Sequence, residues 1–450
     1  MTTKEEPSLL IIGAGTFGTS LAVHASKSYA DASKIKIIDR WSPDGPVQDK
    51  TAAAVDINRI IRTDYTSPLY CNLANEAIHF WFWGIAVQGH FHKTGWVVVD
   101  GSSGEQFGQG VKKTFEERGS HVVEGIDVNG LIEEHDVLKG LDSEALGKGY
   151  FNPEAGWCDA ASATKSYLRI AESRGVERVT GEVEELLMRD DGLGVAGVRL
   201  QDGTVLTADK VVIAVGAWTS SLLSPLEDKL RIEEKDRIER QVTAVGRLSA
   251  YYDLSEEESK HMMDTKLPIV VIGGEVDIIP PYHHIPSLKV NDLKTEFTNT
   301  ITTSSGRRVT APSKKNQMQV PAKLIQESEK VIKGSMPEWT QARSPDRWRI
   351  CYDAVTPTED WVMSRHPDDR LKNMYIAVGG SFHSYKFLPN SGKYMLNVLN
   401  GQSNGEEKDR AWKWKSEDEL KRRAAKEFGD SPRKAERREF RDFEEEKARL

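Results

Sequence analysis

The residues best suited to chemistry in this 450-residue chain lie between Cys351 and Lys393. The stretch opens with C-Y-D-A-V-T-P-T, continues through the apolar run M-Y-I-A-V, and then reads G-G-S-F-H-S-Y-K-F-L-P-N-S-G-K. One of only three cysteines therefore precedes a buried-strand pattern, a glycine pair, and a His and a Lys three residues apart. A thiol, an imidazole and an ammonium group in one short stretch suggest a cofactor held beside a cationic pocket.

A glycine-rich loop near the N-terminus indicates the kind of cofactor. It reads G-A-G-T-F-G at residues 13–18, between a strand pattern and a helical pattern. In this arrangement Gly13 permits the tight turn, Gly15 lets the backbone approach a pyrophosphate, and Gly18 allows close packing of helix on strand. Asp39 ends the next strand pattern, about 20 residues further on, where it would accept hydrogen bonds from a ribose. These features predict a bound dinucleotide.

The choice between FAD and NAD needs a second segment, because the loop fits both and Arg40 leaves a contact with an NADP phosphate open. Residues 207–218 read T-A-D-K-V-V-I-A-V-G-A-W, an apolar strand pattern that ends in Gly216. Such a strand returns the chain to the first one, and a glycine at its end avoids a clash with the cofactor. The combination is common in FAD proteins and unusual in NAD dehydrogenases.

Composition excludes several other classes of function. The formal net charge of -8 argues against nonspecific nucleic-acid binding, and no apolar run reaches the roughly 18 residues that span a membrane. The polar start does not resemble a secretory signal, and three cysteines fit a reducing compartment. His283-His284 and His90-Phe91-His92 have metal-like spacing, but no acid or cysteine completes either set, so we expect no metal site.

The order of the patterns predicts an α/β protein with interleaved domains. We expect a discontinuous, Rossmann-like cofactor domain built from residues 8–70, 150–222 and 345–402. Residues 71–149 and 223–344 would form an inserted α+β substrate domain around a mixed, mainly antiparallel sheet. Residues 403–450 are dominated by Lys, Arg, Glu and Asp, so we expect a solvated, partly helical extension there.

Five places in the chain carry a resemblance to a known family. They are the glycine loop, N-R-I-I-R at residues 58–62 with the following Tyr65, G-Y-F-N-P-E-A-G-W-C-D-A at residues 149–160, G-A-W-T at residues 216–219, and the Cys351–Lys393 stretch. Over residues 8–400 the chain resembles the FAD-dependent amine oxidases, which include monomeric sarcosine oxidase, pipecolate and saccharopine oxidases, and the fungal fructosyl amino acid oxidases (amadoriases). The resemblance implies a cofactor domain of the glutathione reductase type.

The resemblance also implies oxidation of the C–N bond of a secondary-amine amino acid. Hydride passes from carbon to N5 of FAD, water hydrolyses the resulting imine, and dioxygen is reduced to hydrogen peroxide. Arg62 and Lys386 match the family residues that bind the substrate carboxylate, for which a guanidinium offers two parallel hydrogen bonds. His383 matches a histidine near flavin and substrate that is either catalytic or a structural donor.

Further residues match family positions around the flavin ring. Cys351 matches the cysteine that carries a covalent thioether to the flavin 8α-methyl group, and Arg59 would hold negative charge on the reduced ring. Lys289 resembles the lysine that activates oxygen, because a fixed cation stabilises superoxide, and Lys294 is the nearby competitor. The residues expected to contact the cofactor are Gly13, Gly15, Thr16, Phe17, Gly18, Asp39, Arg40, Val183, Gly216, Cys351, Gly380 and Lys386.

The substrate stays open at this level, since N-alkyl, cyclic, saccharopine-like and fructosyl amino acids all fit two carboxylate-binding cations. The context C-Y-D-A departs from the double cysteine of many fructosyl oxidases, which weakens the case for a sugar amine, whereas S-F-H-S-Y-K-F-L-P-N-S-G-K looks fungal. The alternatives are a biosynthetic oxidase of a larger metabolite amine, a flavin dehydrogenase that uses a protein electron acceptor, and a non-catalytic flavoprotein scaffold. Ala448–Leu450, A-R-L, resembles the S-K-L address that a peroxisomal import receptor reads, so we expect a peroxisomal or cytoplasmic location. We also expect a monomer.

Overall fold

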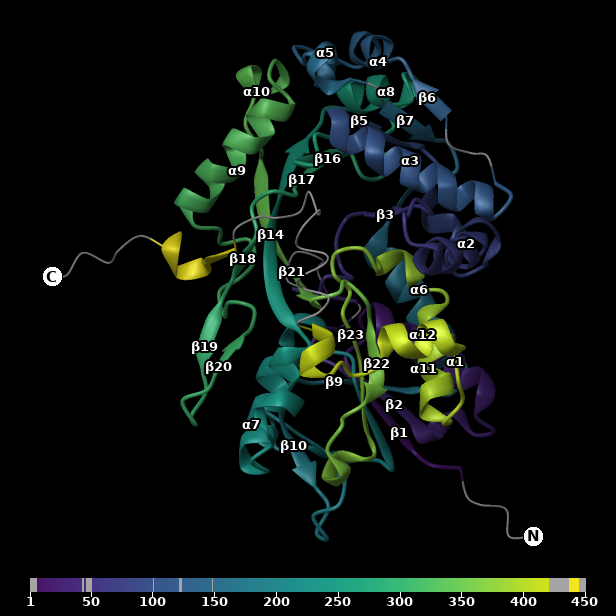
Figure 1. Cartoon of the computed structure of the whole chain (residues 1–450), viewed down its shortest axis with the longest axis vertical. Helices are drawn as coiled ribbons and strands as arrows, with labels where there is room; N and C mark the ends of the chain where they lie inside the picture. The colour runs from purple at the N-terminus through teal and green to yellow at the C-terminus, as the bar shows by residue number, and fades with distance from the viewer. Residues whose placement is uncertain are drawn as a thin grey trace, which may run out of the picture.

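Two sheets of different kinds organise the protein. The computed structural model describes residues 6–42, 44–45, 51–99, 101–120, 124–147, 149–420 and 437–444. Figure 1 shows a smaller, mostly parallel sheet in the lower half of the view and a larger sheet in the upper half, with the long strand β14 (Thr243–Asp253) running between them. Among the described residues, no helix is both long and apolar enough to cross a bilayer.

The smaller sheet has six strands in the order β22-β23-β13-β1-β2-β9, and its neighbours are parallel except for β22 and β23. Its central strands are continuous apolar runs, as expected for a sheet that is covered on both faces. Its strands are β1 (Leu9–Ile12), β2 (Ile35–Asp39), β9 (Glu177–Thr180), β13 (Lys210–Ile213), β22 (Val362–Arg365) and β23 (Met374–Val378).

Helices cover one face of this sheet and a β-meander covers the other. Ile11 and Ile37 pack with the helices α1 (Thr16–Ser28), α6 (Ala160–Ser173) and α11 (Ser391–Leu399). Leu10 and Ile38 pack with α7 (Thr219–Lys229) and the meander β10 (Val183–Met188), β11 (Val195–Leu200) and β12 (Val205–Thr207). Gly392 lets α11 approach α1 closely, because a Cβ atom there would lie 2.2 Å from the backbone of Ser20.

The larger sheet has ten strands in the path β24-β18-β14-β17-β16-β15-β5-β7-β6, with β21 paired along β14. Its described pairs are antiparallel except β5–β15 and β18–β24. Its other strands are β5 (Trp96–Val99), β6 (Glu124–Ile126), β7 (Gly149–Asn152), β15 (Ile269–Ile272), β16 (Val276–Ile279), β17 (Ser287–Asp292), β18 (Phe297–Thr298), β21 (Arg347–Val355) and β24 (Arg438–Glu439).

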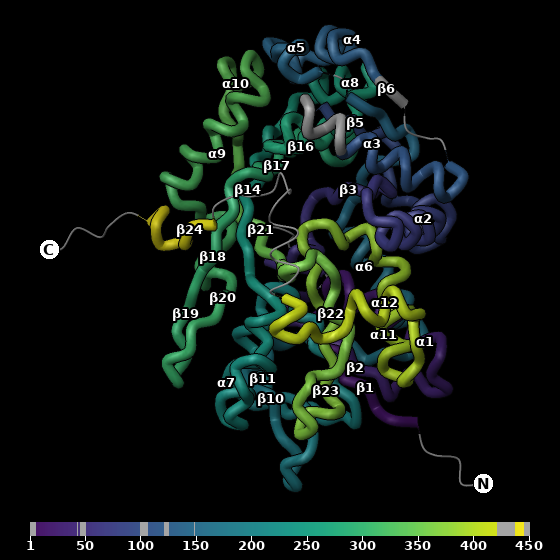
Figure 2. The backbone as a smooth tube through the Cα atoms, viewed as in Figure 1, coloured from purple at the N-terminus to yellow at the C-terminus, as the bar shows by residue number. Residues whose placement is uncertain are grey.

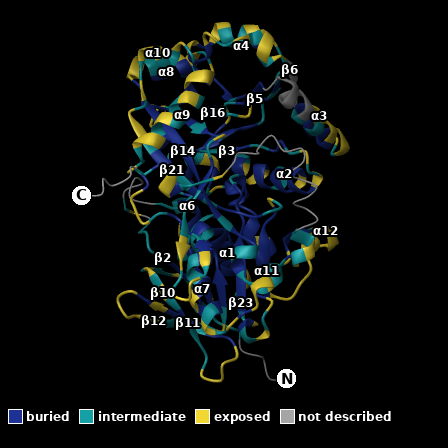
Figure 3. Ribbon diagram, turned by 60° about the vertical axis from the view of Figure 1, so that its left-hand side comes forward, coloured by how far each residue is buried: buried dark blue, intermediate teal, exposed yellow. Residues whose placement is uncertain are grey.

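Short sheets and surface helices complete the fold. A three-stranded sheet joins β3 (Arg59–Ile61), β8 (Gly156–Cys158) and β4 (Phe91–His92), and a hairpin joins β19 (Thr300–Thr302) to β20 (Arg308–Thr310). The helices are α2 (Pro68–Trp83), α3 (Gly101–Glu117), α4 (Val128–Glu134), α5 (Ser143–Leu146), α8 (Glu256–Asp264), α9 (Ala322–Ser335), α10 (Trp339–Ala342) and α12 (Glu406–Trp412). Figure 3 shows buried residues along both sheets and exposed residues on the outer faces of helices such as α4 and α9.

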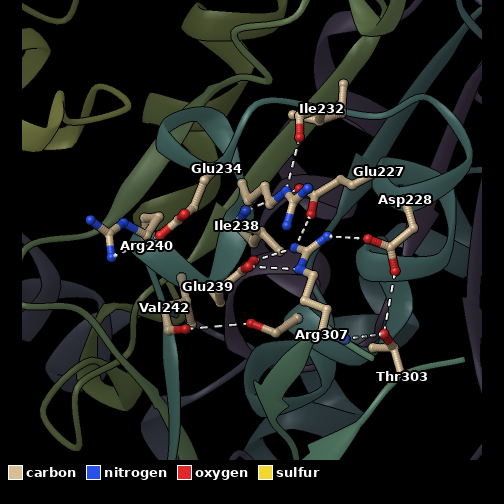
Figure 4. A network of polar contacts seen from close by, with 12 residues as sticks. Glu227, Asp228, Ile232, Glu234, Ile238, Glu239, Arg240, Val242, Thr303 and Arg307 are labelled. Atoms are coloured by element: carbon tan, nitrogen blue, oxygen red, sulfur yellow. Dashed lines mark hydrogen bonds and ion pairs between the residues drawn. The ribbon is translucent and has the colours of Figure 1, made fainter. Parts of the chain in front are cut away.

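A buried arginine connects the β19–β20 hairpin to the helix beside the six-stranded sheet. Arg307 donates to Asp228 at 3.0 Å and to Glu239 at 2.6 Å, and it also pairs with Glu227, which has no exposed side-chain surface (Figure 4). Glu227 accepts a further hydrogen bond from the backbone N–H of Ile238 at 3.0 Å. One cation therefore pairs with three acids, two from α7 and one from the turn at residues 238–240.

The predicted fold class is confirmed, and the domain boundaries stay a prediction. Two strands, β21 and β7, cross those boundaries. The sequence places β21 with the cofactor segments, but residues 347–355 pair along their whole length with β14 of the larger sheet. Similarly, β7 pairs with β5 of that sheet, although residues 150–152 fall in the predicted cofactor segment. Strand β17 begins at Ser287, after a turn closed by Tyr282 and Ile285.

The described residues of the predicted extension, 403–420 and 437–444, are mostly exposed or half-buried and include the helix α12, but a few of their side chains are buried in the core. Trp412 of α12 is fully buried and stacks on Trp361, with ring centroids 4.8 Å apart. Further on, Phe440 packs against Phe297 beside the β24–β18 pair, which Figure 2 shows at the edge of the larger sheet. A few aromatic residues within a charged stretch are enough to dock it. The predicted address at 448–450 lies outside the described residues.

Replacing Trp412 by Ala is expected to lower the free energy of unfolding by about 3–5 kcal/mol, because the change leaves a cavity against Trp361. Trp83→Ala is the matched control, since that side chain is 78% exposed, and it should change stability by less than about 0.5 kcal/mol. Urea denaturation of the holoprotein measures both values. Equal stability of the wild type and the Trp412 variant would mean that α12 does not contribute to the core.

Candidate active site

A cavity of about 520 Å³ lies where the two sheets meet. The carboxyl ends of β1, β2 and β13 open into it from the six-stranded side, and residues of β14, β16, β17 and β21 line it from the larger sheet. In open α/β sheets, ligands bind outside the carboxyl ends of the strands. All the sequence-predicted site residues except Gly18 line this cavity, and Gly18 lies directly beside it in the glycine loop.

The glycine loop has the shape that a dinucleotide pyrophosphate needs. Gly13 has φ of +103°, and a Cβ atom there would lie 2.4 Å from the carbonyl oxygen of Ala214; a Cβ at Gly18 would lie 1.8 Å from the Gly13 carbonyl oxygen. Gly15 differs, because its nearest described neighbour would be 3.9 Å from the added atom, on the cavity side. No side chain caps α1 among the described residues, so its first N–H groups are available to an anion. The loop therefore fits the pyrophosphate of FAD.

Asp39 and Arg40 already have protein partners at the end of β2. Asp39 accepts hydrogen bonds from the backbone N–H groups of Ala14 at 2.7 Å and Trp41 at 3.1 Å, so it fixes the glycine loop. Burial raises the pKa of Asp39. The Arg40 guanidinium lies 4.4 Å from the ring centroids of both Trp41 and Trp218. Enclosure between two indoles argues against Arg40 as a phosphate ligand.

Cys351 lies at the other end of the cavity, on β21. Its sulfur is 3.3 Å from a guanidinium nitrogen of Arg59, and it lines the cavity. Cys71 and Cys158 do not line it; both are buried, and burial raises the pKa of each thiol. Only one of the three cysteines is therefore positioned to meet a ligand.

A buried carboxylate that the sequence analysis missed holds the cations of this region together. Asp56 accepts hydrogen bonds from Arg59 at 2.5 Å and from Lys289 at 2.8 Å, and Arg349 lies 3.4 Å away. The Tyr251 hydroxyl also donates to it, at 2.9 Å. Burial alone would raise the pKa of Asp56, but the three cations outweigh burial and hold that pKa well below its ordinary value. An acid just before the N-R-I-I-R motif was the available signal.

Lys289 is the cavity lysine, and Lys294 is not. Lys289 has no exposed side-chain surface, lines the cavity and pairs with Asp56, whereas Lys294 is exposed and pairs with Glu275. Burial lowers the pKa of Lys289, and Asp56 opposes that shift. A cation is thus held in a dry site, where a fixed charge has its largest effect.

Arg62 has an unsatisfied polar atom in the cavity. Its guanidinium lies 4.8 Å from the ring centroid of Tyr65 and 4.6 Å from that of Trp96, and one terminal nitrogen is buried without a hydrogen-bond partner in the described structure. Lys386 donates to the Tyr65 hydroxyl at 3.0 Å. A buried donor of this kind costs roughly 1–3 kcal/mol unless a ligand satisfies it. The arrangement suits a carboxylate.

His383 is tied to the protein through both ring nitrogens. Nε2 lies 3.0 Å from the carbonyl oxygen of Glu359, which can only accept, so Nε2 carries the proton. Nδ1 therefore accepts from the Tyr65 hydroxyl at 3.0 Å. These bonds favour the structural role for His383 over the catalytic one.

The loop before His383 has an unusual backbone. Ser381 and Phe382 have φ of 46° and 59°, in the region that favours glycine, and such residues cost of order 1–3 kcal/mol each. A hydrogen bond of 2.7 Å from the Phe382 N–H to Asp353 helps to hold this conformation. No local sequence signal indicates this conformation, since neither residue is a glycine.

The comparison with known proteins identifies the class. Residues 8–397 match the family of FAD dependent oxidoreductases (DAO), and the chain belongs to this family. The predicted family, the enzyme class and FAD as cofactor are thereby confirmed. The residue roles within the site stay predictions.

Particular relatives and structures agree with this class. The chain is 24% identical to the L-saccharopine oxidase of Schizosaccharomyces pombe, across 91% of this chain and 93% of the relative. It is 24% identical to a monomeric sarcosine oxidase of Bacillus sp., across 86% and 90%, and 26% identical to the amino acid oxidase fsqB of Aspergillus fumigatus, across 87% and 92%. Its fold is similar to that of Amadoriase II from Aspergillus fumigatus in complex with FSA, with a TM-score of 0.80 at 22% identity over 99% and 98% of the chains.

The charge cluster generates a stability prediction. Asp56→Asn leaves Lys289, Arg59 and Arg349 buried without their shared anion, so the free energy of unfolding should fall by about 3–5 kcal/mol. The second change Lys289→Met in that background should restore part of the loss, because it removes one unpaired cation. Asp264→Asn, which breaks the exposed pair with Lys260, is the control and should cost less than about 1 kcal/mol. Additivity of the double variant, judged with the single variant Lys289→Met, would contradict the coupling. Urea denaturation measures the wild type and these four variants.

Proposed function

We propose that this protein is an oxidase of the C–N bond of an amino acid with a secondary amine, and that it reduces dioxygen to hydrogen peroxide. The unsatisfied guanidinium nitrogen of Arg62 carries the proposal, since it faces a cavity that also contains the FAD loop. Relatives named for saccharopine and sarcosine, two secondary-amine amino acids, support the substrate class.

Arg62, Lys386 and the side chains around them bind the substrate and fix its orientation. FAD, when bound, supplies the acceptor for the hydride that leaves the substrate carbon. Arg62 takes the carboxylate through its planar edge, with its faces fixed by Tyr65 and Trp96, and Lys386 adds a second charge. Apolar side chains such as Val98 and Val271 line the cavity beside them and exclude water from the reacting carbon. Holding the substrate in one orientation lowers the entropic part of the barrier.

The residues around Asp56 serve the reaction with oxygen. One-electron reduction of dioxygen creates an anion, and a preorganised cation stabilises charge that develops in the transition state. Lys289 supplies this cation, and Asp56 opposes the shift by which burial lowers the pKa of Lys289. A dehydrogenase that passes electrons to a carrier protein would not need a buried lysine at this point.

We also propose that Cys351 forms a thioether with the flavin 8α-methyl group. The position of the sulfur in the cavity and the absence of the other two cysteines from its lining support this. Forming this bond would take one proton from the thiol and one from the methyl group, and the two electrons left over would reduce the flavin ring, from which dioxygen would accept them. Arg59 lies 3.3 Å from the sulfur. The peroxisomal address at Ala448–Leu450 and the monomeric state stay predictions.

An anaerobic screen tests the function. Secondary-amine amino acids, including sarcosine, L-pipecolate, L-saccharopine and a fructosyl amino acid, are mixed with the holoenzyme under nitrogen, and at least one should bleach the yellow flavin absorbance. Readmission of air should release one peroxide per turnover. Arg62→Met should raise KM by about 10- to 100-fold, because it removes a charged hydrogen-bond donor to the carboxylate.

The matched control is Arg118→Met, since Arg118 lies outside the cavity against Phe115. It should leave KM unchanged. A flavin that no amine in the panel bleaches would contradict the proposed function, and bleaching without peroxide would indicate a dehydrogenase.

Acid precipitation tests the covalent link. The wild-type pellet should remain yellow, because the thioether survives denaturation, whereas Cys351→Ser should release its flavin into the supernatant. Cys71→Ser is the control and should keep a yellow pellet. A colourless wild-type pellet would show that FAD is bound without a covalent bond.

A further inference from the structure

A row of side chains crosses the larger sheet on the face toward the cavity. Val271 of β15 is paired with Asp277 of β16, Asp277 with Asn291 of β17, and Asn291 with Ser249 of β14. All four line the cavity. Lys289 lies two residues before Asn291 on β17 and therefore points to the same face. The carboxylate of Asp277 thus lies on the same face of the sheet as the cation of Lys289.

Hydrogen bonds fix the orientation of this carboxylate. The Ser249 hydroxyl donates to Oδ1 of Asn291 at 2.6 Å, so the amide nitrogen of Asn291 points the other way and donates to Oδ1 of Asp277. In the described structure, Oδ2 of Asp277 has no hydrogen-bond partner. The residue is 8% exposed and lines the cavity. One oxygen is thus anchored and the other is presented to a ligand.

The surroundings of Asp277 suit a group that exchanges a proton. The charged groups that act on it are Lys289 from β17, Arg247 from β14 and Arg59 from β3. Burial raises the pKa of Asp277, whereas these cations hold it down. Such opposing effects are typical of catalytic acids and bases, which work best when their pKa lies near the working pH.

The register of the sheet places Arg62 and Asp277 on the same side of the cavity. Val98 of β5 is in line with Val271 and Asp277. Trp96 lies two residues before Val98 on β5, so its side chain points to the same face of the sheet. Arg62 stacks on Trp96, and both Arg62 and Asp277 line the cavity.

We propose that Asp277 receives the proton of the substrate ammonium, while Arg62 and Lys386 hold the substrate carboxylate. The carboxylate of Asp277 takes one N–H proton and becomes a carboxylic acid, and the electron pair of that N–H bond stays on nitrogen as the lone pair of the neutral amine. That lone pair then stabilises the cation that forms as hydride leaves the adjacent carbon. The inference rests on the proposed function. It adds that the substrate binds as a zwitterion, with its carboxylate negative and its amine protonated.

A purely structural role for Asp277 makes a different prediction. If the carboxylate only anchors Asn291, then Asp277→Asn should be silent, because the carbonyl oxygen of the new amide can accept the same hydrogen bond. If Asp277 receives the proton, the substitution removes the acceptor with almost no change in shape. The bound ammonium must then lose its proton to solvent.

The test compares holoenzymes of the wild type, Asp277→Asn, Asp277→Glu and Glu275→Gln. The last variant is the control, because Glu275 is an exposed acid of the same hairpin that pairs with Lys294 outside the cavity. The rate of anaerobic flavin reduction by the best amine of the screen is measured from pH 6 to 10. Asp277→Asn should lower the rate at pH 7 by about 10²- to 10⁴-fold and shift the rise of the profile to higher pH, and Asp277→Glu should recover part of the rate. An unchanged profile, or an equal loss in Glu275→Gln, would overturn the proposal.

A binding measurement separates this proposal from the proposed function. Dithionite-reduced holoenzyme cannot accept another hydride, so it can be titrated calorimetrically with L-pipecolate and with tetrahydropyran-2-carboxylate, in which oxygen replaces the nitrogen. The wild type should bind the amine at least about 10-fold more tightly, as expected for one charged hydrogen bond, and Asp277→Asn should lose that preference. A wild type without the preference, or a variant that keeps it, overturns the role of Asp277 even where amines bleach the flavin. Failure of every amine in the screen counts against the proposed function alone.

Discussion

The carboxylate of Asp56 is the interaction on which the rest of the site depends. It precedes β3, on the side of the glycine loop, yet its partners Lys289, Arg349 and Tyr251 all lie on strands of the larger sheet. The two halves of the molecule are thus joined at the cavity by a buried cluster of charge. Because an unpaired buried charge is so costly, the cluster fixes where the two sheets meet and hence the width of the cavity between them.

The two sheets contribute different kinds of groups to the cavity. The six-stranded side presents backbone N–H groups and glycines, which suit phosphates, and the larger sheet presents side chains that suit an amine and oxygen chemistry. Two of the five described non-glycine residues with positive φ, Ser381 and Phe382, lie next to the cavity residue His383, and a hydrogen bond to Asp353 compensates for part of their strain. Natural proteins tolerate such local conflict mainly where function requires it.

Much of this arrangement could be predicted from the sequence, for a physical reason in each case. Gly13 and Gly18 are required by backbone contacts that any such loop must make, so their spacing identified the fold. Lys289 could be chosen over Lys294 because it stands in the strand-like context L-K-V, and Lys294 indeed follows the end of β17. By contrast, Asp56 meets Lys289 and Tyr251 from strands distant in sequence, and Arg59, a cation that acts on Asp277, is likewise distant in sequence from it. No local pattern encodes such contacts. The burial of Trp412 could not be predicted from composition. The many charged residues of the last segment dominate its composition, whereas a few aromatic residues decide whether the segment packs on the core.

The two described parts of the chain's last segment attach to different halves of the molecule. Helix α12 rests beside β22 through Trp412, whereas β24 extends the larger sheet and brings Phe440 onto Phe297. The last segment of the chain therefore contributes buried aromatic side chains to both halves of the molecule. A shortened protein that stops before α12 would uncover aromatic surface at two separate sites, and it would become prone to self-association before its catalytic groups were disturbed.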